Sequence, residues 1–492
     1  MAIPRLITII IYTLIIIFIG HKFFKKLEKN LSPWEKAKKL NFTSLNNKEI
    51  LYNIEEVLNY NEKFSSTLEE LKKTLFFKIF KLNLEPECTI FQQEKICKNS
   101  QCNICECDEN EIPKIWTQPT HTGEFLNMKI EDPFNKWIDK YTINTKQWLL
   151  EEDIDSSKGS YINLLKNPEG YTGYRGAHIW SAIFKENCFS DKFYLLCKED
   201  RTFFRIFSGW LSNTNFEIGM NFHDNINNKS YINVTMLTER LLNEKERVDN
   251  FFFLYSLVIK AVNKAKEFLL EYNYESGNKT EDENTIKLIN NIFNNSAIDL
   301  QYLEESFNET TPELHNFMNS QKISELIVRF RNISSIIDCV TCSKCRMHAK
   351  LEIFGIGTTL KILFANYIEL KESISRNELV AFINLFAKLS KNVGNIKFID
   401  QRINQAHFYL KFKYAAIVFF LFIFWVYCVF FDKDDDKNKN VNEKKNEIKK
   451  ENFINKKNGI NGTNGINSEK KKKENKNHID FIFRNIYSYF LN

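Results

Sequence analysis

Three common sequence signatures are missing from this 492-residue chain. No Gly-x-Gly-x-x-Gly motif follows a predicted strand, which excludes the doubly wound sheet that binds dinucleotides at its first turn. No RNA-recognition motif, zinc finger or Gly-rich basic segment is present, and the formal net charge is only +6. Nucleic acid is therefore not expected as a partner. No internal repeat is evident either, which excludes a solenoid or propeller.

An uncharged, Ile-rich run from Leu6 to Gly20 follows Arg5 near the N-terminus. Its length matches the apolar region of a secretory signal peptide, but no small-residue cleavage site follows it. We therefore predict that residues 1–24 form a signal peptide or an uncleaved signal anchor.

A second uncharged run extends from Tyr414 to Phe431. A helix needs about 17–25 apolar residues to span a bilayer, so we predict a transmembrane helix over residues 412–431. Residues 432–492 form a Lys/Asn-rich, low-complexity tail that cannot bury enough apolar surface to fold.

The central region, residues 25–411, is expected to form one mostly helical domain. Apolar residues recur at helical spacing from Asp249 to Tyr272, from Ile323 to Ile337 and from Leu360 to Leu370. Residues 273–319 are polar and weakly periodic, and we predict a loop insertion there. Asn-x-Ser/Thr matches favour a lumenal, glycosylated domain; among them are those that begin at Asn41, Asn233, Asn278, Asn308 and Asn332.

The cysteines are clustered. Cys339, Cys342 and Cys345 form a C-x-x-C-x-x-C motif, which would occupy one face of a helix. A C-x-x-C pair at a helix start favours thiolate chemistry, because the helix N-terminus and nearby Lys344 and Arg346 lower a thiol pKa. The same spacing also suits an iron–sulfur cluster or zinc. The signal-like N-terminus favours the thiol interpretation.

A second cluster lies in a polar stretch without helical periodicity. Cys97 and Cys102 form a C-x4-C pair, and Cys105 and Cys107 follow it. A dithiol on a mobile loop can exchange with the cysteines of a partner protein. A static disulfide knot would give the same spacing.

Several segments together resemble the endoplasmic reticulum oxidoreductins, the Ero1 family. The longest runs from Phe330 through the three-cysteine motif to Phe364, and others are Asn167 to Tyr174, Arg205 to Gly209 and Asn250 to Tyr255. The spacing of Cys88, Cys97, Cys102 and Cys107 is also similar to that family. These matches cover most of residues 85–410.

The resemblance implies an all-α fold, with FAD held in a helix-bundle core and with disulfide-tethered loops. It implies that Cys342 and Cys345 are the active-site pair beside FAD, and that no metal is bound. It implies that Cys97 and Cys102 form a shuttle pair that takes electrons from protein disulfide isomerase. Structural disulfides are implied between Cys88 and Cys339 and between Cys188 and Cys197. Cys107 matches a regulatory position, and Cys105 is an additional cysteine.

The resemblance also assigns residues to the flavin nucleotide: Thr172, Trp180, Ser208, Arg240 and Arg247. An indole can stack on a flat ring, and arginine pairs with phosphate in bidentate geometry. Two positions depart from the family pattern. Gly170 stands where the family usually has Arg, and Leu211 stands where it usually has His.

The expected function is that of a thiol oxidase that makes disulfides, with dioxygen reduced to hydrogen peroxide. Its expected location is the endoplasmic reticulum membrane, with the catalytic domain in the lumen. Three alternatives compete with it. They are a short Erv-type sulfhydryl oxidase, whose paired-histidine flavin motif is not seen here, a membrane-anchored disulfide-rich binding protein, and a Cys-ligated metal protein without oxidase activity.

Overall fold

The computed structural model describes residues 25, 31–35, 37, 54–83, 88, 102–117, 159–169, 177–186, 201–224, 229–294, 323–364 and 374–454. The chain divides into two compact units, Met1–Leu410 and Lys411–Asn492. The α-helices and the π-helix η7 are α2 (Ile54–Leu71), α3 (Leu75–Lys78), α4 (Lys114–Thr117), α8 (Ala177–Glu186), α9 (Arg201–Met220), α10 (Val234–Leu237), η7 (Thr238–Leu242), α11 (Lys245–Lys264), α12 (Lys266–Glu271), α13 (Lys279–Phe293), α16 (Ile323–Ile337), α17 (Ser343–Phe364) and α19 (Arg376–Ile454). Two short 3-10 helices are η1 (Ser32–Trp34) and η4 (Glu109–Glu111).

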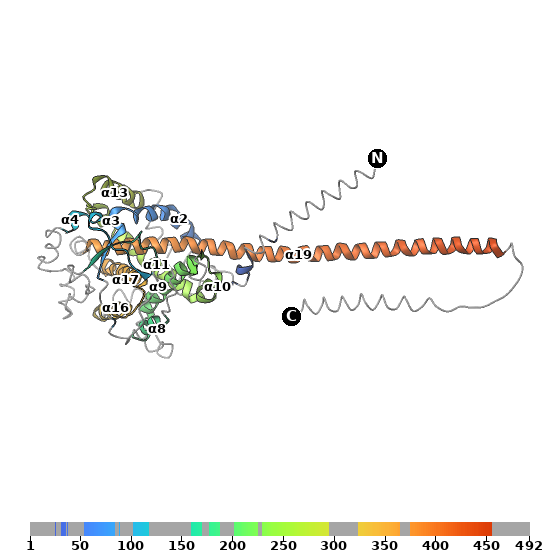
Figure 1. Cartoon of the computed structure of the whole chain (residues 1–492), viewed down its shortest axis with the longest axis horizontal. Coiled ribbons are helices and arrows are strands. Elements are labelled where there is room, and N and C mark those ends of the chain that lie inside the picture. The colour runs from blue at the N-terminus through green and yellow to red at the C-terminus, as the bar shows by residue number, and fades with distance from the viewer. Residues whose placement is uncertain are drawn as a thin grey trace. The chain divides into compact units, whose positions relative to one another are not determined.

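Helix α11 lies at the centre of the first unit. It packs along α9 and against α17, and α16 packs against both α17 and α8 (Figure 1). The backbones of α9 and α11 approach closely at Gly209, where an added Cβ would lie 2.9 Å from the Leu254 Cβ and still closer to the Asn250 carbonyl oxygen. The absence of a side chain at Gly209 therefore permits this helix pair.

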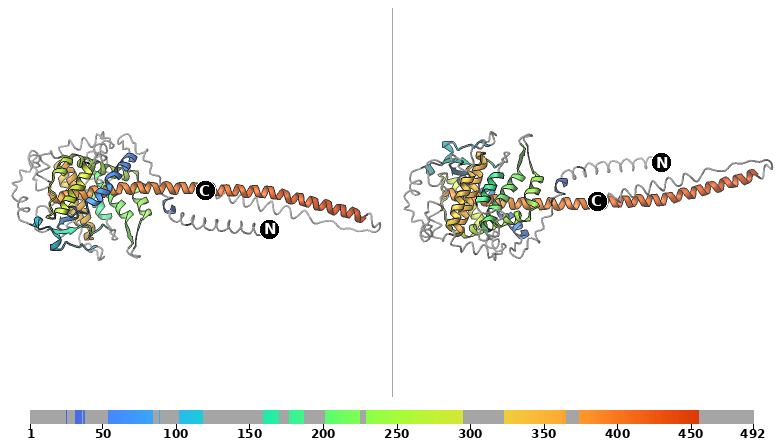
Figure 2. Two further views of the ribbon diagram at one scale, coloured as in Figure 1. Left: turned by 90° about the horizontal axis from the view of Figure 1, so that it is seen from above. Right: turned by 90° about the horizontal axis from the view of Figure 1, so that it is seen from below.

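The first part of α19 is also a core element of this unit. Its side chains from Leu379 to Ala406 are buried at helical spacing, and Figure 2 shows this part of the helix running among the other helices. Three elements meet in one buried polar contact. Asn61 of α2 donates to the Ser390 carbonyl at 2.9 Å and accepts from the Tyr255 hydroxyl at 2.7 Å.

Two small antiparallel sheets accompany the helices, and the sequence did not predict them. Strand β1 (Ile79–Leu82) pairs with β2 (Ser160–Asn163), and β3 (Phe222–Asp224) pairs with β4 (Lys229–Tyr231). The β1–β2 sheet matters for the site, because Glu106 forms an isolated bridge with Ile162. The cysteine-rich segment is thereby attached to a fixed strand.

The helical prediction is confirmed: the described residues are mostly helical, and α16 begins and ends where the periodicity predicts. The periodic stretch 249–272 lies on α11 and α12, which are separated at Ala265. The loop predicted for residues 273–319 is wrong where α13 forms. The side chains of Thr285, Ile289, Ile292 and Phe293 are buried there at helical spacing.

The predictions for the two ends have different outcomes. Residues 1–24 and 455–492 lie outside the described residues. In the part of the chain that the structure describes, no helix has both the length and the apolar content that a bilayer crossing needs. The transmembrane helix predicted over residues 412–431 therefore finds no support there. The side chains from residue 423 onward are not described.

Candidate functional site

The C-x-x-C pair lies at the first turn of α17. Helix α17 begins at Ser343, so Cys342 occupies the N-cap position and Cys345 the third helical position. The backbone N–H of Cys345 donates to the Cys342 Sγ at 3.5 Å, and the Arg346 N–H donates to the Cys342 carbonyl at 2.8 Å. Both cysteines are thiols in this structure. The predicted helix start at this pair is confirmed.

The surroundings of the pair favour negative charge on sulfur. The N–H groups at a helix start stabilise an anion, and a capping sulfur accepts one of them directly. Cys342 is 1% exposed, whereas Cys345 is partly exposed. Cys345 is therefore the more exposed residue of the pair.

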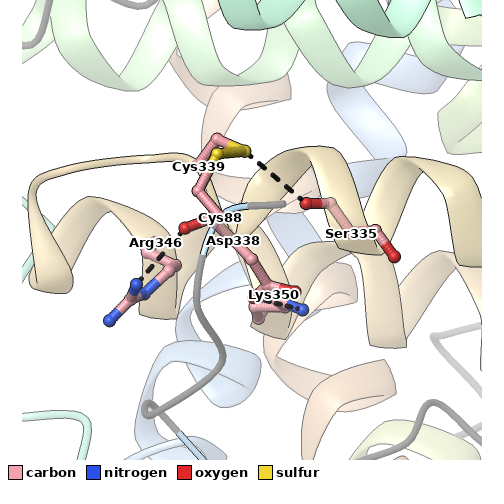
Figure 3. The surroundings of a disulfide bond; sticks show 6 residues. All are labelled: Cys88, Ser335, Asp338, Cys339, Arg346 and Lys350. Atoms are coloured by element: carbon pink, nitrogen blue, oxygen red, sulfur yellow. Dashed lines mark hydrogen bonds and ion pairs between the residues drawn. A yellow bond between two sulfur atoms is a disulfide. The ribbon is translucent and has the colours of Figure 1, made fainter. Parts of the chain in front are cut away.

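Cys339 does not share the helical face predicted for the three cysteines. It lies in the turn between α16 and α17, where its N–H donates to the Ile336 carbonyl at 3.1 Å. Its sulfur is joined to that of Cys88 in a disulfide, the pairing that the family resemblance implies. The Cys339 sulfur lies 3.9 Å from the Ser335 carbonyl oxygen (Figure 3). That is a van der Waals contact, because a disulfide sulfur carries no proton.

A buried ion pair holds the same turn. The Lys350 Nζ lies 2.8 Å from the Asp338 Oδ1 and donates to the Ser334 Oγ at 2.7 Å. The Arg346 Nη1 donates to the Asp338 carbonyl at 3.3 Å. The side chains of Lys350 and Arg346 lie beside the disulfide (Figure 3). The start of α17 is thus fixed to the end of α16 by one covalent bond and several polar contacts.

The second cysteine cluster is only partly described. Cys102 is buried and disulfide-bonded. Cys97, Cys188 and Cys197 lie outside the described residues. Cys105 is an exposed thiol and Cys107 a partly buried one. Burial raises the pKa of the Cys107 thiol, and Glu111 adds to the shift.

Asn167 connects this cluster to α17. Its side chain accepts from the Cys105 N–H at 2.8 Å and donates to the Cys105 carbonyl at 2.7 Å. Its own carbonyl oxygen lies 2.8 Å from the Nε2 of His348. The backbone of the cysteine-rich segment is therefore positioned through one buried residue relative to the helix that carries Cys345.

A buried charge cluster lies farther along α17, and the sequence did not predict it. The Lys388 Nζ lies 2.6 Å from the Glu169 Oε2 and 2.5 Å from the Glu352 Oε1. Asn213 Nδ2 donates to the other oxygen of Glu352 at 3.0 Å. The three charged members of this cluster are Glu169, Glu352 and Lys388. These residues lie far apart in the sequence, so no spacing pattern indicates the cluster.

The two carboxyl groups differ in pKa. Burial raises the pKa of Glu352 to about 7, and the charge of Glu169 adds to that effect, against the attraction of Lys388. For Glu169, burial also acts upward, but Lys388 and its other neighbours lower the pKa overall. The pKa of Lys388 is raised by its two carboxylate partners despite burial. Two carboxylates on one ammonium group therefore ionise unequally.

The residues assigned to the flavin include two with informative surroundings. Trp180 of α8 packs edge-on against Trp210 of α9, with ring centroids 4.7 Å apart. The Trp210 Nε1 is buried and has no hydrogen-bond partner among the described residues. The Ser208 Oγ accepts from the Asn250 Nδ2 at 2.9 Å, so its own hydroxyl proton can still be donated.

This arrangement fits a flavin. A partly exposed indole suits a flat ring, and a buried N–H without an acceptor suits a carbonyl-rich ligand. Trp210 was not predicted, and its buried, unpaired N–H could be found only from the fold.

The two arginines assigned to the nucleotide are exposed. Arg240 lies in the π-helix η7, and its Nη1 lies 3.5 Å from the Asn215 Oδ1. Arg247 donates to the Arg240 carbonyl at 2.5 Å. Leu211 is partly exposed on α9, whereas Thr172 and Gly170 lie outside the described residues. The roles of these residues toward FAD stay predictions.

Comparisons with known proteins agree on one family. The model of "Endoplasmic Reticulum Oxidoreductin 1 (ERO1)" matches residues 63–396. Endoplasmic reticulum oxidoreductin-2 of Arabidopsis thaliana is 32% identical over 353 residues, which cover 68% of this chain and 73% of that protein. ERO1-like protein alpha of Rattus norvegicus is 28% identical, and the match covers 70% of this chain and 88% of that protein.

A solved structure of Ero1p, described as a source of disulfide bonds for oxidative protein folding, gives a TM-score of 0.50 at 26% identity. The match covers 72% of this chain and 99% of that one. Neither a metal protein nor a binding protein without activity finds support in these comparisons. The chain therefore belongs to the endoplasmic reticulum oxidoreductin family of thiol oxidoreductases.

Proposed function

We propose that this chain makes disulfides by oxidising protein disulfide isomerase, with FAD bound among its helices and dioxygen as the final electron acceptor, giving hydrogen peroxide. Electrons would enter at the shuttle pair, Cys97 and Cys102. They would then pass to the active-site pair, Cys342 and Cys345, and from that pair to the flavin.

The observation that carries this proposal is the position of the active-site pair. Cys342 and Cys345 lie at the N-terminus of a helix that is mostly buried beyond its first turn, and Cys342 Sγ accepts an N–H of that helix. A structural cysteine pair needs no such stabilisation of charge on sulfur, whereas a nucleophilic or electron-donating thiolate does.

Trp180, Ser208 and Trp210 would hold the flavin ring, and Arg240 and Arg247 would bind its phosphates. When bound, the flavin supplies two-electron chemistry that joins thiol oxidation to dioxygen. The protein's own contribution would be to hold a reactive thiol pair next to the flavin ring and to keep water away from both.

The shuttle pair would work by thiol–disulfide exchange. A thiolate of the isomerase attacks the shuttle disulfide, a mixed disulfide forms, and a second isomerase thiolate releases it. One S–S bond breaks in the shuttle pair and one forms in the isomerase. The reduced shuttle then transfers its two electrons to the active-site disulfide in the same manner.

The test uses the full chain purified from a flavin-supplied host. We expect a yellow protein whose visible spectrum is that of a bound flavin, and which consumes oxygen when reduced protein disulfide isomerase is added. Hydrogen peroxide should form in a 1:1 ratio to oxygen consumed. A colourless protein, or one with two cysteines bound to zinc or iron, would refute the proposal.

A further inference from the structure

The indole of Trp210 carries a hydrogen-bond donor that the fold leaves unused. Trp210 is 2% exposed, and its Nε1 has no hydrogen-bond partner among the described residues. An indole N–H only donates, and a buried donor without an acceptor is costly and rare in folded proteins. The unpaired N–H of Trp210 therefore favours a ligand that brings an acceptor to this place.

Comparable donors elsewhere in the core are paired. The Nε1 of Trp116, which is 7% exposed, donates to the Glu275 carbonyl at 3.0 Å. The hydroxyl of Tyr274, which is 1% exposed, donates to the Leu269 carbonyl at 2.7 Å. Trp210 differs from these two residues in its unpaired donor, although it is buried to a similar degree.

The surroundings of Trp210 place this donor beside a residue assigned to FAD. The Trp210 ring lies edge-on to that of Trp180, which the family resemblance assigns to FAD, with ring centroids 4.7 Å apart. It also lies edge-on to the ring of Phe207, with centroids 5.9 Å apart. Trp180 is only partly buried, so part of its ring is available to a ligand. A ligand that stacks on Trp180 would therefore lie next to the Trp210 ring.

The next residue of α9 explains why the site needs another donor. Leu211 stands where the family usually has His, and its side chain has no N–H or O–H group. The hydrogen bond that a histidine could donate to the nucleotide is therefore lost at this position. Successive side chains of a helix point about 100° apart, so residues 210 and 211 can both contact a ligand as large as FAD.

We infer that the Trp210 Nε1–H donates a hydrogen bond to a ring acceptor of bound FAD and replaces the hydrogen bond that Leu211 cannot make. The inference rests on the proposed function, because that function requires FAD. Trp180 would hold the plane of the ring by stacking, and Trp210 would fix how the ring is turned within that plane. A few polar groups of this kind give an apolar ligand site its specificity.

The test measures the affinity of the full chain for FAD. Bound FAD is removed by dialysis against a mild chaotrope and then titrated back, and the decrease in flavin emission on binding gives the dissociation constant. Trp210→Phe keeps an aromatic ring and removes the N–H. We expect this variant to bind FAD about tenfold more weakly than the wild type, which is the usual scale for one lost hydrogen bond.

The matched control is Trp116→Phe. It also replaces a buried indole, but the N–H that it removes is bound to the Glu275 carbonyl. Trp116→Phe should lower the melting temperature and leave the affinity for FAD within about twofold of the wild-type value. Equal weakening of FAD binding in the two variants would overturn the inference.

The double variant Trp210→Phe/Leu211→His separates the hydrogen bond from ring packing. It keeps the smaller ring at position 210 and adds a donor at the position where the family has one. We expect it to regain FAD affinity to within about threefold of the wild type. Affinity that stays at the level of Trp210→Phe would mean that lost packing causes the weakening, and would overturn the inference.

Leu211→His alone covers the case in which Trp210→Phe does not fold, since Leu211 is partly exposed. If Trp210 already donates to FAD, the added histidine should change the affinity by less than about twofold, whereas a tenfold gain would show that the donor was missing. Wild-type protein that binds no FAD would refute the proposed function. Wild-type protein that binds FAD no more tightly than Trp210→Phe would refute only the role of Trp210.

Discussion

Asn167 and Cys105 form a closed pair of hydrogen bonds, in which the carboxamide of Asn167 both accepts from and donates to the Cys105 backbone. Asn167 is completely buried. We expect Asn167→Ala to lower the free energy of unfolding by about 2–4 kcal/mol, because a backbone N–H and a carbonyl lose their partners.

Urea denaturation measures this loss, and limited proteolysis within residues 102–107 should become faster. Asn290→Ala is the control, since the Asn290 side chain makes a solvent-facing hydrogen bond to its own helix. It should cost less than about 1 kcal/mol. Equal losses in the two variants would contradict the role given to Asn167.

Loss of either active-site sulfur should abolish activity. We expect Cys345→Ala and Cys342→Ala each to reduce oxygen consumption with reduced protein disulfide isomerase to background. Cys105→Ala, at an exposed thiol of the other cluster, should retain most of the wild-type rate. An oxygen electrode gives the rates, and substantial turnover by Cys345→Ala would mean that the electrons take another route.

The disulfide between Cys88 and Cys339 should make a large contribution to stability. It closes a loop with a sequence separation of 251 residues, and long loops lose the most entropy when crosslinked. We expect the double variant Cys88→Ala/Cys339→Ala to lose about 3–5 kcal/mol in unfolding free energy. Thermal and urea unfolding, with Cys105→Ala as the reference variant, would measure this loss of unfolding free energy. A loss below about 1 kcal/mol would contradict the stabilising role of the disulfide.

The stability of the fold should depend on pH through Glu352. Its pKa is about 7 in the folded chain against an ordinary value of 4.5. Since the folded value is raised, the stabilising contribution is complete below about pH 4.5 and is lost as the pH rises through 7. The wild-type chain should lose stability across this window relative to Glu352→Gln, by at most about 1.4 kcal/mol per pH unit.

Denaturant titrations of both proteins at pH 4.5, 5.5, 6.5 and 7.5 would show this difference. Both proteins share His348 and Glu169, so the comparison isolates the Glu352 carboxyl together with its effect on these two neighbours. A difference that stays constant with pH, or that moves in favour of the wild type, would refute the raised pKa of Glu352.

Two helical glycines should respond in opposite directions to alanine. At Gly209 an added Cβ would press on Leu254 and on the Asn250 backbone, whereas at Gly357 no atom lies within 4 Å of it. We expect Gly209→Ala to destabilise by about 1–3 kcal/mol and Gly357→Ala to stabilise by about 0.5–1 kcal/mol. Melting temperatures of the two variants would decide, and a stabilised Gly209→Ala would show that α9 and α11 are less tightly packed.

The parts that the sequence predicts well are local ones. Helix α16 follows from its apolar spacing, and the redox pair follows from C-x-x-C beside a predicted helix. The charge cluster could not be predicted, because Glu169, Glu352 and Lys388 come together only through the fold. The placement of Cys339 was wrong for a related reason: its disulfide to Cys88 belongs to a turn, and spacing alone does not reveal where a helix begins.

Two Asn-x-Thr matches show that one short sequence pattern can have two physical causes. The pattern at Asn233 and Asn278 predicts glycosylation, which stays a prediction, and the structure shows that both residues are also N-caps. Their side chains accept from the N–H groups of Met236 at 3.0 Å and of Glu281 at 3.4 Å. Asn is among the best N-cap residues, so in an Asn-rich helical chain the same short pattern arises for a second physical reason.

The tie between Cys88 and Cys339 has a consequence for how the chain is made. At about 5–20 residues per second, a ribosome needs roughly 10–50 s to advance from the first cysteine to the second. Throughout that interval Cys88 has no native partner, while the cysteines at 97, 102, 105 and 107 emerge close behind it. A newly made molecule therefore presents the Cys88 thiol to four nearby cysteines before Cys339 exists, so a non-native disulfide formed in that interval must be exchanged before the native one can form.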